Sequence, residues 1–332
     1  MSRSPLLSVR DLTVSVPLGS RFFPAVDGVS FDLVKGESLG VAGESGCGKT
    51  LLGRALLNLA PEGARVSGAL LWEGSDLLRL PEREWDPIRG GRIGMVFQEP
   101  GAALDPVQTV GDQIREAIRL HERVSARQAR RLALERLREV SFPDPERGLD
   151  EFPHRLSGGM RQRAMIAVAL AGNPELLVAD EPTTALDATV AAEIMLLLER
   201  LRDRRGLTLV LISHDLDLVA RACRRVLVLY AGRVVEEAET AEIFFSPRHP
   251  YTRGLLRCLP RLDPRAPVRP RQRFETIAGA VEGLAERKES RCGFAGRCPE
   301  RFDPCEKSVP SLFPSGGAQV RCFLYEGAGT AG

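Results

Sequence analysis

The segment that most constrains the fold is GESGCGKT at residues 43–50, which satisfies the pattern G-x-x-x-x-G-K-[ST]. It follows ESLGVAG, an apolar run of strand length, and precedes TLLGRALLNLA, whose apolar residues recur at helical spacing. A strand, a glycine-rich loop and a helix in this order form the phosphate-binding unit of α/β nucleotide proteins. Backbone N–H groups of such a loop turn inward around phosphate oxygens. The predicted phosphate-binding residues are Gly43, Glu44, Ser45, Gly46, Cys47, Gly48, Lys49 and Thr50.

A second motif supplies carboxylates. The segment ELLVADEP at residues 175–182 ends an apolar run with two adjacent acids. Such a pair is often only a solvated turn, but a phosphate loop in the same chain favours a catalytic role. We predict that Asp180 holds Mg²⁺ through its hydration shell, together with the hydroxyl of Thr50, and that Glu181 polarises the water that attacks the γ-phosphate. In this motif class Lys49 reaches the β- and γ-phosphates.

A third segment, LSGGMRQR at residues 156–163, separates this chain from most nucleotide-binding proteins, which lack it. With it, the chain resembles the ATP-binding subunits of ABC transporters, whose signature is LSGG-x-x-QR. Gln98 in MVFQEP matches the Q-loop of that family, Asp187 in ALD the D-loop, and His214 in LISHD the switch histidine. The resemblance covers residues 1 to about 245.

This resemblance implies an α/β fold with a RecA-like core, an antiparallel β subdomain and a helical subdomain at about residues 100–170. Residues 111–140 carry apolar positions at helical spacing, in agreement with that expectation. The resemblance further implies that Gln98 and His214 sense the γ-phosphate, with Gln98 also near the metal. The residues expected to close over the ATP of a second subunit are Ser157, Gly158, Gly159 and Asp187. Phe22 and Phe23 are the only nearby aromatic candidates for stacking on adenine, and a core role for one of them is equally compatible with the sequence.

Several stretches, among them MVFQEP, FPHRLSGGMRQR and RHPYTRGLL, look like the oligopeptide, dipeptide and nickel importer branch of the family. That branch implies ATP hydrolysis coupled to import of peptides, with nickel chelates, glutathione or sugars as alternative cargo. It also implies two membrane-spanning permeases, an extracytoplasmic substrate-binding protein and a second, homologous ATPase. The alternative from another class is a soluble ABC ATPase of a multi-enzyme or nucleic-acid complex. A nucleotide-binding regulator that never hydrolyses is a third, but the presence of both Glu181 and His214 argues against it.

Composition narrows these possibilities. The formal net charge of +2 gives no support for a nucleic-acid partner. No run of eighteen apolar residues occurs, and the N-terminus has no secretory pattern, so we expect a peripheral protein on the cytoplasmic face of the membrane. After the ATPase region we expect an extension at residues 246–332. Its segment PRLDPRAPVRPRQR, at residues 260–273, is typical of a linker or an extended arm.

The extension contains Cys292, Cys298, Cys305 and Cys322. Disulfides are disfavoured in a reducing compartment, and four buried free cysteines are a second possibility. Zinc sites favour C-x2-C to C-x4-C spacing, which is missing here. The wider spacing and a proline after Cys298 favour an iron–sulfur cluster, and the resemblance to the importer branch points the same way. We therefore predict a [4Fe–4S] cluster on these four thiolates, with Zn²⁺ as the alternative.

Overall fold

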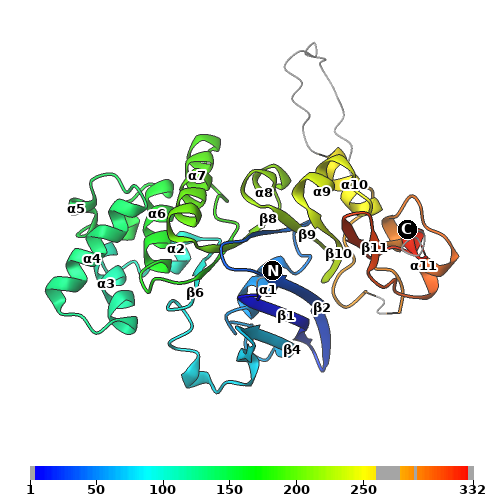
Figure 1. The fold of residues 1–332 in the computed structure, drawn as a ribbon, viewed down its shortest axis with the longest axis horizontal. Coiled ribbons are helices and arrows are strands. Elements are labelled where there is room, and N and C mark those ends of the chain that lie inside the picture. Colours follow the sequence, from blue (N-terminus) through cyan, green and yellow to red (C-terminus); the bar gives the residue numbers. More distant parts are fainter. Residues whose placement is uncertain (1–3, 259–276, 288–289, 328–332) are drawn as a thin grey trace, which may run out of the picture.

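A computed structural model describes residues 4–258, 277–287 and 290–327 of the chain, so the expected linker at residues 260–273 lies outside the described residues. Two β-sheets organise the molecule (Figure 1). The smaller sheet is antiparallel and has the strand order β2-β1-β4-β5. Its strands are β1 (Leu7–Leu18), β2 (Arg21–Leu33), β4 (Arg65–Trp72) and β5 (Ser75–Asp76).

The larger sheet has the order β11-β12-β10-β9-β3-β8-β7-β6, and its centre is parallel. The parallel strands β3 (Ser38–Ala42), β7 (Leu176–Asp180) and β8 (Thr208–Ser213) are buried along their whole length, as expected for a sheet covered on both faces. The remaining strands are β6 (Ile93–Val96), β9 (Arg225–Tyr230), β10 (Arg233–Glu239), β11 (Phe313–Ser315) and β12 (Ala318–Val320). This α/β architecture, with an antiparallel sheet and a helical part, confirms the predicted fold class.

The C-terminal residues continue the larger sheet. Strands β9 and β10 form a hairpin whose turn residues Ala231 and Gly232 both have positive φ, and β12 then pairs with β10 in antiparallel register. Apolar side chains of the extension, among them Phe294 and Val320, belong to the same buried cluster as the helical part and the central strands. The extension is therefore fastened to residues 1–245 by hydrogen bonds and by a shared core.

The helical part lies on one side of the larger sheet, at the left of Figure 1. Residues 111–140 form two helices rather than one, because Ser125 starts a new helix with a capping box that involves Gln128. The helices of this part are α2 (Pro100–Ala103), α3 (Val110–His121), α4 (Ala126–Glu139), α5 (Pro145–Gly148), η3 (Pro153–Arg155) and α6 (Gly158–Ala169).

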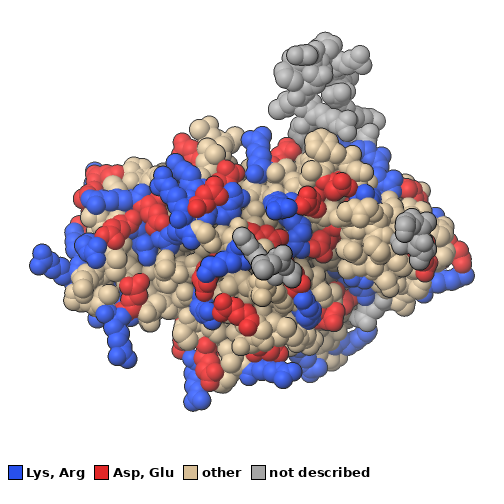
Figure 2. Space-filling view, viewed as in Figure 1, with Lys and Arg blue, Asp and Glu red and all other residues tan. Residues whose placement is uncertain are grey.

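The other helices cover the sheets or belong to the extension. They are α1 (Lys49–Ala55), η1 (Leu77–Arg79), η2 (Glu82–Glu84), α7 (Ala188–Arg205), α8 (Leu216–Ala222), α9 (Thr240–Phe245), α10 (Pro250–Arg257), η4 (Ala295–Arg297), α11 (Asp303–Lys307) and η5 (Phe323–Tyr325). None of the helices in the described part of the chain is long and apolar enough to cross a bilayer. On the face shown in Figure 2, basic and acidic side chains are interspersed rather than separated into fields of one sign.

Candidate active site

The phosphate loop joins β3 to α1, as the sequence predicts. Gly43 and Gly48 have φ of 152° and 104°, which side-chain-bearing residues rarely adopt. A Cβ on Gly43 would lie 2.3 Å from the carbonyl oxygen of Leu229, and one on Gly48 would lie 2.5 Å from that of Ala25. The loop glycines are therefore required both by backbone conformation and by the close approach of neighbouring strands.

Lys49 is folded back over this loop. Its side chain is 4% exposed, and Nζ donates to the carbonyl oxygens of Gly43 at 2.8 Å and Glu44 at 2.9 Å. The ammonium therefore sits above the turn, and its third contact, 3.8 Å to Sγ of Cys47, is a weak one that a bound anion can replace. Cys47 is buried beside it, and burial raises the pKa of the thiol. Cys47 thus stays a neutral thiol, and its carbonyl oxygen accepts from the N–H of Gly232.

The predicted metal-binding pair meets at the end of β7. The hydroxyl of Thr50 donates to Oδ1 of Asp180 at 3.1 Å, and Asp180 is only 1% exposed. Burial raises the pKa of Asp180, and the neighbouring Glu181 carboxylate adds to the rise. A cation bound here would favour the ionised form, because it would neutralise a buried charge.

Glu181 lies where three other groups converge. Its φ of 45° turns the chain sharply after the strand, and its N–H donates to the carbonyl oxygen of Ile212. Its Oε2 accepts from the hydroxyl of Thr184 at 2.8 Å and from the side-chain amide of Gln98 at 3.4 Å, and it lies 3.1 Å from Nδ1 of His214. These contacts hold the carboxylate in one orientation at the mouth of the site.

The topology explains this convergence. Gln98 follows β6, Glu181 follows β7, His214 follows β8, and the phosphate loop follows β3. Because these four strands are parallel neighbours, their carboxyl ends lie along one edge of the sheet, where ligands bind in open α/β sheets. A cavity of about 460 Å³ opens there and includes Lys49 and Thr50 in its lining. Its volume lies in the range of small-molecule sites.

The structure places the other predicted ATP contacts elsewhere. Ser157 caps α6 by accepting from the N–H of Met160 at 3.3 Å, and both Ser157 and Gly158 are exposed. Asp187 caps α7 and is also exposed. A Cβ on Gly159 would lie 2.7 Å from the side chain of Val190, so α6 and α7 begin in close contact. None of the predicted signature and D-loop residues is among the described residues that line the phosphate-loop cavity.

The two candidate adenine-stacking residues are engaged otherwise. The guanidinium of Arg65 lies 3.7 Å from the centre of the Phe22 ring. Phe23 is 9% exposed and has Arg21 over its ring. Neither phenylalanine is among the described residues that line the cavity.

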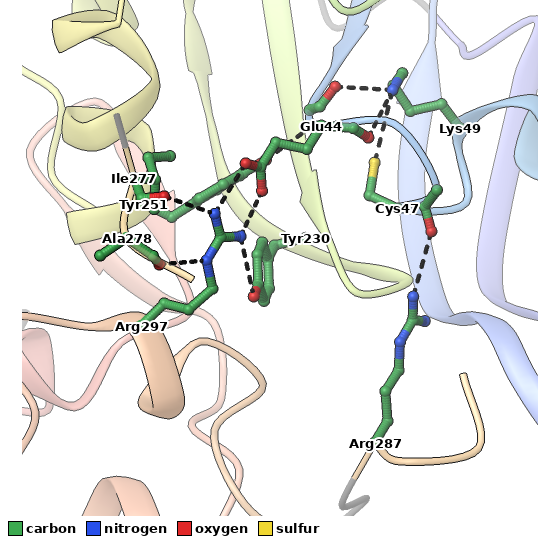
Figure 3. A network of polar contacts seen from close by, with 11 residues as sticks. Glu44, Cys47, Lys49, Tyr230, Tyr251, Ile277, Ala278, Arg287 and Arg297 are labelled. Atoms are coloured by element: carbon green, nitrogen blue, oxygen red, sulfur yellow. Dashed lines mark hydrogen bonds and ion pairs between the residues drawn. The ribbon is translucent and has the colours of Figure 1, made fainter. Parts of the chain in front are cut away.

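The C-terminal extension reaches this site, which we did not predict from the sequence (Figure 3). Arg297 binds the carboxylate of Glu44 with both terminal nitrogens, and Tyr251 Oη accepts from the N–H of Glu44 at 2.8 Å. Arg287 donates to the carbonyl oxygen of Gly46 at 3.3 Å. The only sequence signal was the segment RHPYTRGLL, which contains Tyr251 but was interpreted only as a mark of the branch.

The four extension cysteines lie near one another but do not form a recognisable metal site. The N–H of Cys292 donates to the carbonyl oxygen of Cys305, and Cys292, Cys298 and Cys305 all lie close enough to Cys322 to influence the pKa of its thiol. Burial raises the pKa of Cys292 and Cys298, and that of Cys322 to about 11, so these groups are neutral thiols at pH 7. All cysteines are free, and the described residues contain no group of three or more His, Cys, Asp or Glu arranged to hold a metal ion. The predicted [4Fe–4S] or Zn²⁺ site is thus not supported by this geometry.

A family model described as ABC transporter matches residues 26–184, and one described as oligopeptide/dipeptide transporter, C-terminal region, matches residues 235–305. The probable peptide ABC transporter ATP-binding protein y4tR of Sinorhizobium fredii is 48% identical over 310 residues, which cover 92% of this chain and 91% of that protein. The oligopeptide transport ATP-binding protein AppD of Bacillus subtilis is 42% identical over 329 residues, covering 98% of each. Among solved structures, a dimer of the ATP-binding cassette MJ0796 bound to ADP and Pi aligns with a TM-score of 0.64 at 29% identity, covering 70% of this chain and 98% of that one.

Proposed function

The chain belongs to the ABC transporter family of ATP-binding proteins, in its peptide-transport branch, and from this premise we propose that it hydrolyses ATP to power peptide import through a membrane permease. The observation that carries the proposal is the arrangement at the carboxyl edge of the larger sheet. A buried lysine over a phosphate loop lies beside an acid pair, and a glutamine and a histidine contact the second acid.

Each residue of this arrangement has a separate task in the proposed reaction. The loop amides and Lys49 bind the β- and γ-phosphates. Glu181 accepts hydrogen bonds from a water in line with the γ-phosphate and polarises it, while Gln98 and His214 fix the orientation of that carboxylate. His214 is 59% exposed, so it can also turn toward the γ-phosphate when nucleotide is bound.

Thr50 and Asp180 are suited to hold Mg²⁺. Gln98, whose side-chain amide lies 3.4 Å from the Glu181 carboxylate, would supply a third oxygen ligand. Oxygen ligands of this kind are those that Mg²⁺ prefers. The bound ion would neutralise charge that develops on the β- and γ-phosphates.

We further propose that Ser157, Gly158, Gly159 and Asp187 contact the ATP of a second, homologous ATPase subunit. Two observations support this. The signature and D-loop residues are near one another but lie outside the cavity of their own phosphate loop, and the helix cap at Ser157 is exposed. In addition, a structurally similar cassette was solved as a dimer. In a heterodimer, this chain would contact one permease and the homologous ATPase would contact the other.

The same proposal includes the remaining partners and the location. A peptide-importer ATPase requires transmembrane permeases, and we infer two of them, together with a substrate-binding protein on the outer side. The chain would then be peripheral on the cytoplasmic face of the membrane. Residues 1–245 would be the motor, with a helical subdomain at about 100–170 that meets the permeases, and residues 246–332 the extension.

A cluster on Cys292, Cys298, Cys305 and Cys322 is retained as a hypothesis, because the four thiols lie in one part of the extension. Thiolates are the usual ligands of iron–sulfur clusters, and a cluster would require these side chains to move and to lose their protons. Anaerobically purified protein should then contain about four irons per chain and absorb at about 400 nm. Iron-free, colourless protein would exclude the cluster, and one zinc per chain would assign the site to Zn²⁺.

The central experiment uses the complete transporter in proteoliposomes, with Glu181→Gln as the test variant and the exposed Glu62→Gln as the matched control. Glu181→Gln should retain Mg²⁺-ATP binding and lower the hydrolysis rate by about 10²–10⁴-fold, because the water loses its base. Peptide uptake should fall in parallel, and Glu62→Gln should change neither quantity. Hydrolysis that persists in Glu181→Gln would refute the assignment of the base. Co-purification with soluble enzymes alone, without permeases, would refute the transport function.

A further inference from the structure

The nucleotide cavity has a wall that comes from the far end of the sequence. Residues 281–284 and Arg287 line the same cavity as Gly46, Lys49 and Thr50. This segment belongs to the extension and follows a part of the chain outside the described residues. The cavity that holds the phosphate loop is therefore completed by residues more than 230 positions away from it.

Buried polar contacts fix the position of this wall. The Nη1 and Nη2 atoms of Arg297 lie 2.6 and 3.0 Å from the two carboxylate oxygens of Glu44, and the arginine side chain is only 7% exposed. Arg297 also donates to the carbonyl oxygens of Ile277 and Ala278, just before the wall segment (Figure 3). Two-point binding of a carboxylate by a buried guanidinium is geometrically specific. The extension is thus held against the phosphate loop at a defined distance.

Within this wall, Arg287 has more hydrogen-bonding capacity than it uses. Its Nη2 donates to the carbonyl oxygen of Gly46 at 3.3 Å and its Nε to that of Glu282 at 3.4 Å, both long for hydrogen bonds. Its Nη1 is buried and has no hydrogen-bond partner among the described residues. Burial lowers the pKa of the guanidinium, although nearby acidic groups partly offset the effect. A buried cationic donor without a partner is costly unless an anion occupies the adjoining space.

We propose that Arg287 is a ligand of the bound nucleotide and donates to one of its phosphate oxygens. The inference rests on the proposed function, since it assumes that the loop at residues 43–50 binds ATP. Arg287 is already within hydrogen-bonding distance of that loop, and a guanidinium matches phosphate oxygens in geometry and charge. Binding of nucleotide would supply the anion that the free Nη1 lacks.

The same wall supplies apolar surface for the rest of the nucleotide. Val281 and Leu284 line the cavity together with Val16 and Ala25. The base and ribose would pack among these aliphatic side chains. This accounts for an ATP site in which no aromatic residue is among the described lining residues.

The test measures equilibrium binding of Mg²⁺-ATP to the full chain carrying Glu181→Gln, which prevents turnover. Arg287→Ala in this background should raise the Kd by about tenfold to a hundredfold, because one charge-assisted hydrogen bond is lost. Arg287→Lys should give an intermediate Kd, since it keeps the charge and loses the planar fork. The matched control is Arg301→Ala, which removes an exposed arginine elsewhere in the extension and should leave the Kd unchanged. Equal urea midpoints of the variants would show that folding is preserved.

Adenosine as a competitor separates a phosphate contact from a structural effect on the loop. If Arg287 binds phosphate, Arg287→Ala should weaken ATP binding and leave the affinity for adenosine unchanged. An equal loss for both ligands, an unchanged Kd for ATP, or a tighter Kd in Arg287→Ala would each overturn the inference. Failure of the parent chain to bind ATP would instead refute the proposed function, so the two failures are distinguishable.

Discussion

Replacing Arg297 by methionine is expected to destabilise the protein, because it leaves the Glu44 carboxylate without its bidentate partner. The arginine side chain is 7% exposed and that of the glutamate 28% exposed, so solvent screens the pair only in part. A hydrogen bond between charged groups contributes about 1.5–3 kcal/mol, and with partial screening we take about 2 kcal/mol for the two bonds of the pair together. The bond to the carbonyl oxygen of Ala278 at 2.9 Å adds about 1 kcal/mol. Arg297→Met should therefore lower the free energy of unfolding by about 3 kcal/mol.

A double-mutant cycle with Glu44→Gln isolates the ion pair from the other contacts of Arg297. The free energy of unfolding of the four proteins is measured by urea denaturation followed by circular dichroism. We expect a coupling energy of about 2 kcal/mol between the two positions. A coupling below about 0.5 kcal/mol, the range of exposed ion pairs, would refute the conclusion that this pair fastens the extension to the phosphate loop.

Three further predictions concern the site itself. Gly48→Ala should abolish measurable ATP binding, because its Cβ would lie 2.5 Å from the carbonyl oxygen of Ala25. Gly46→Ala has open space around its Cβ, so it should weaken ATP binding by only about 1 kcal/mol through backbone strain. Equal affinities of the two variants in calorimetry would contradict this prediction. Asp180→Asn should stabilise the nucleotide-free chain at pH 7 yet weaken Mg²⁺-dependent ATP binding. Because the pKa of Asp180 is raised in the folded state, the stability of the wild-type chain falls as pH rises from the unfolded-state pKa near 4 to the folded-state pKa. The advantage of Asp180→Asn in urea midpoint should therefore vanish below about pH 4, and an advantage that persists there would refute this prediction. His214→Ala should slow ATP hydrolysis without weakening ATP binding. If the hydrolysis rate and the affinity for ATP fell together, His214 would be needed for the fold of the site rather than for the reaction.

The family and the fold class could be predicted because the motifs are contiguous and ordered. Each of LSGGMRQR, ADEP and LISHD is a short segment whose role depends on its place at a strand end or helix start, and the structure has those ends where the sequence indicates them. The break between α3 and α4 was missed because apolar spacing continues through it. Its signal, the serine–glutamine capping box at residues 125–128, was present in the sequence. The metal prediction for the cysteines depended on spacing and resemblance alone, and the thiols are gathered without a ligand arrangement.

The phosphate loop can be identified from the sequence, because the requirements of that loop are local. Positive φ at Gly43 and Gly48 restricts those positions to glycine, and the strand before the loop and the helix after it can be identified from a few residues on either side. The positions of Arg287 and Arg297 beside this loop, in contrast, depend on the tertiary fold. Arg297 is 253 residues from Glu44, and an arginine carries no signal for its partner in a chain with many arginines. Their contacts arise because β12 pairs with β10 and the extension shares the core of the motor, which sets distant segments side by side.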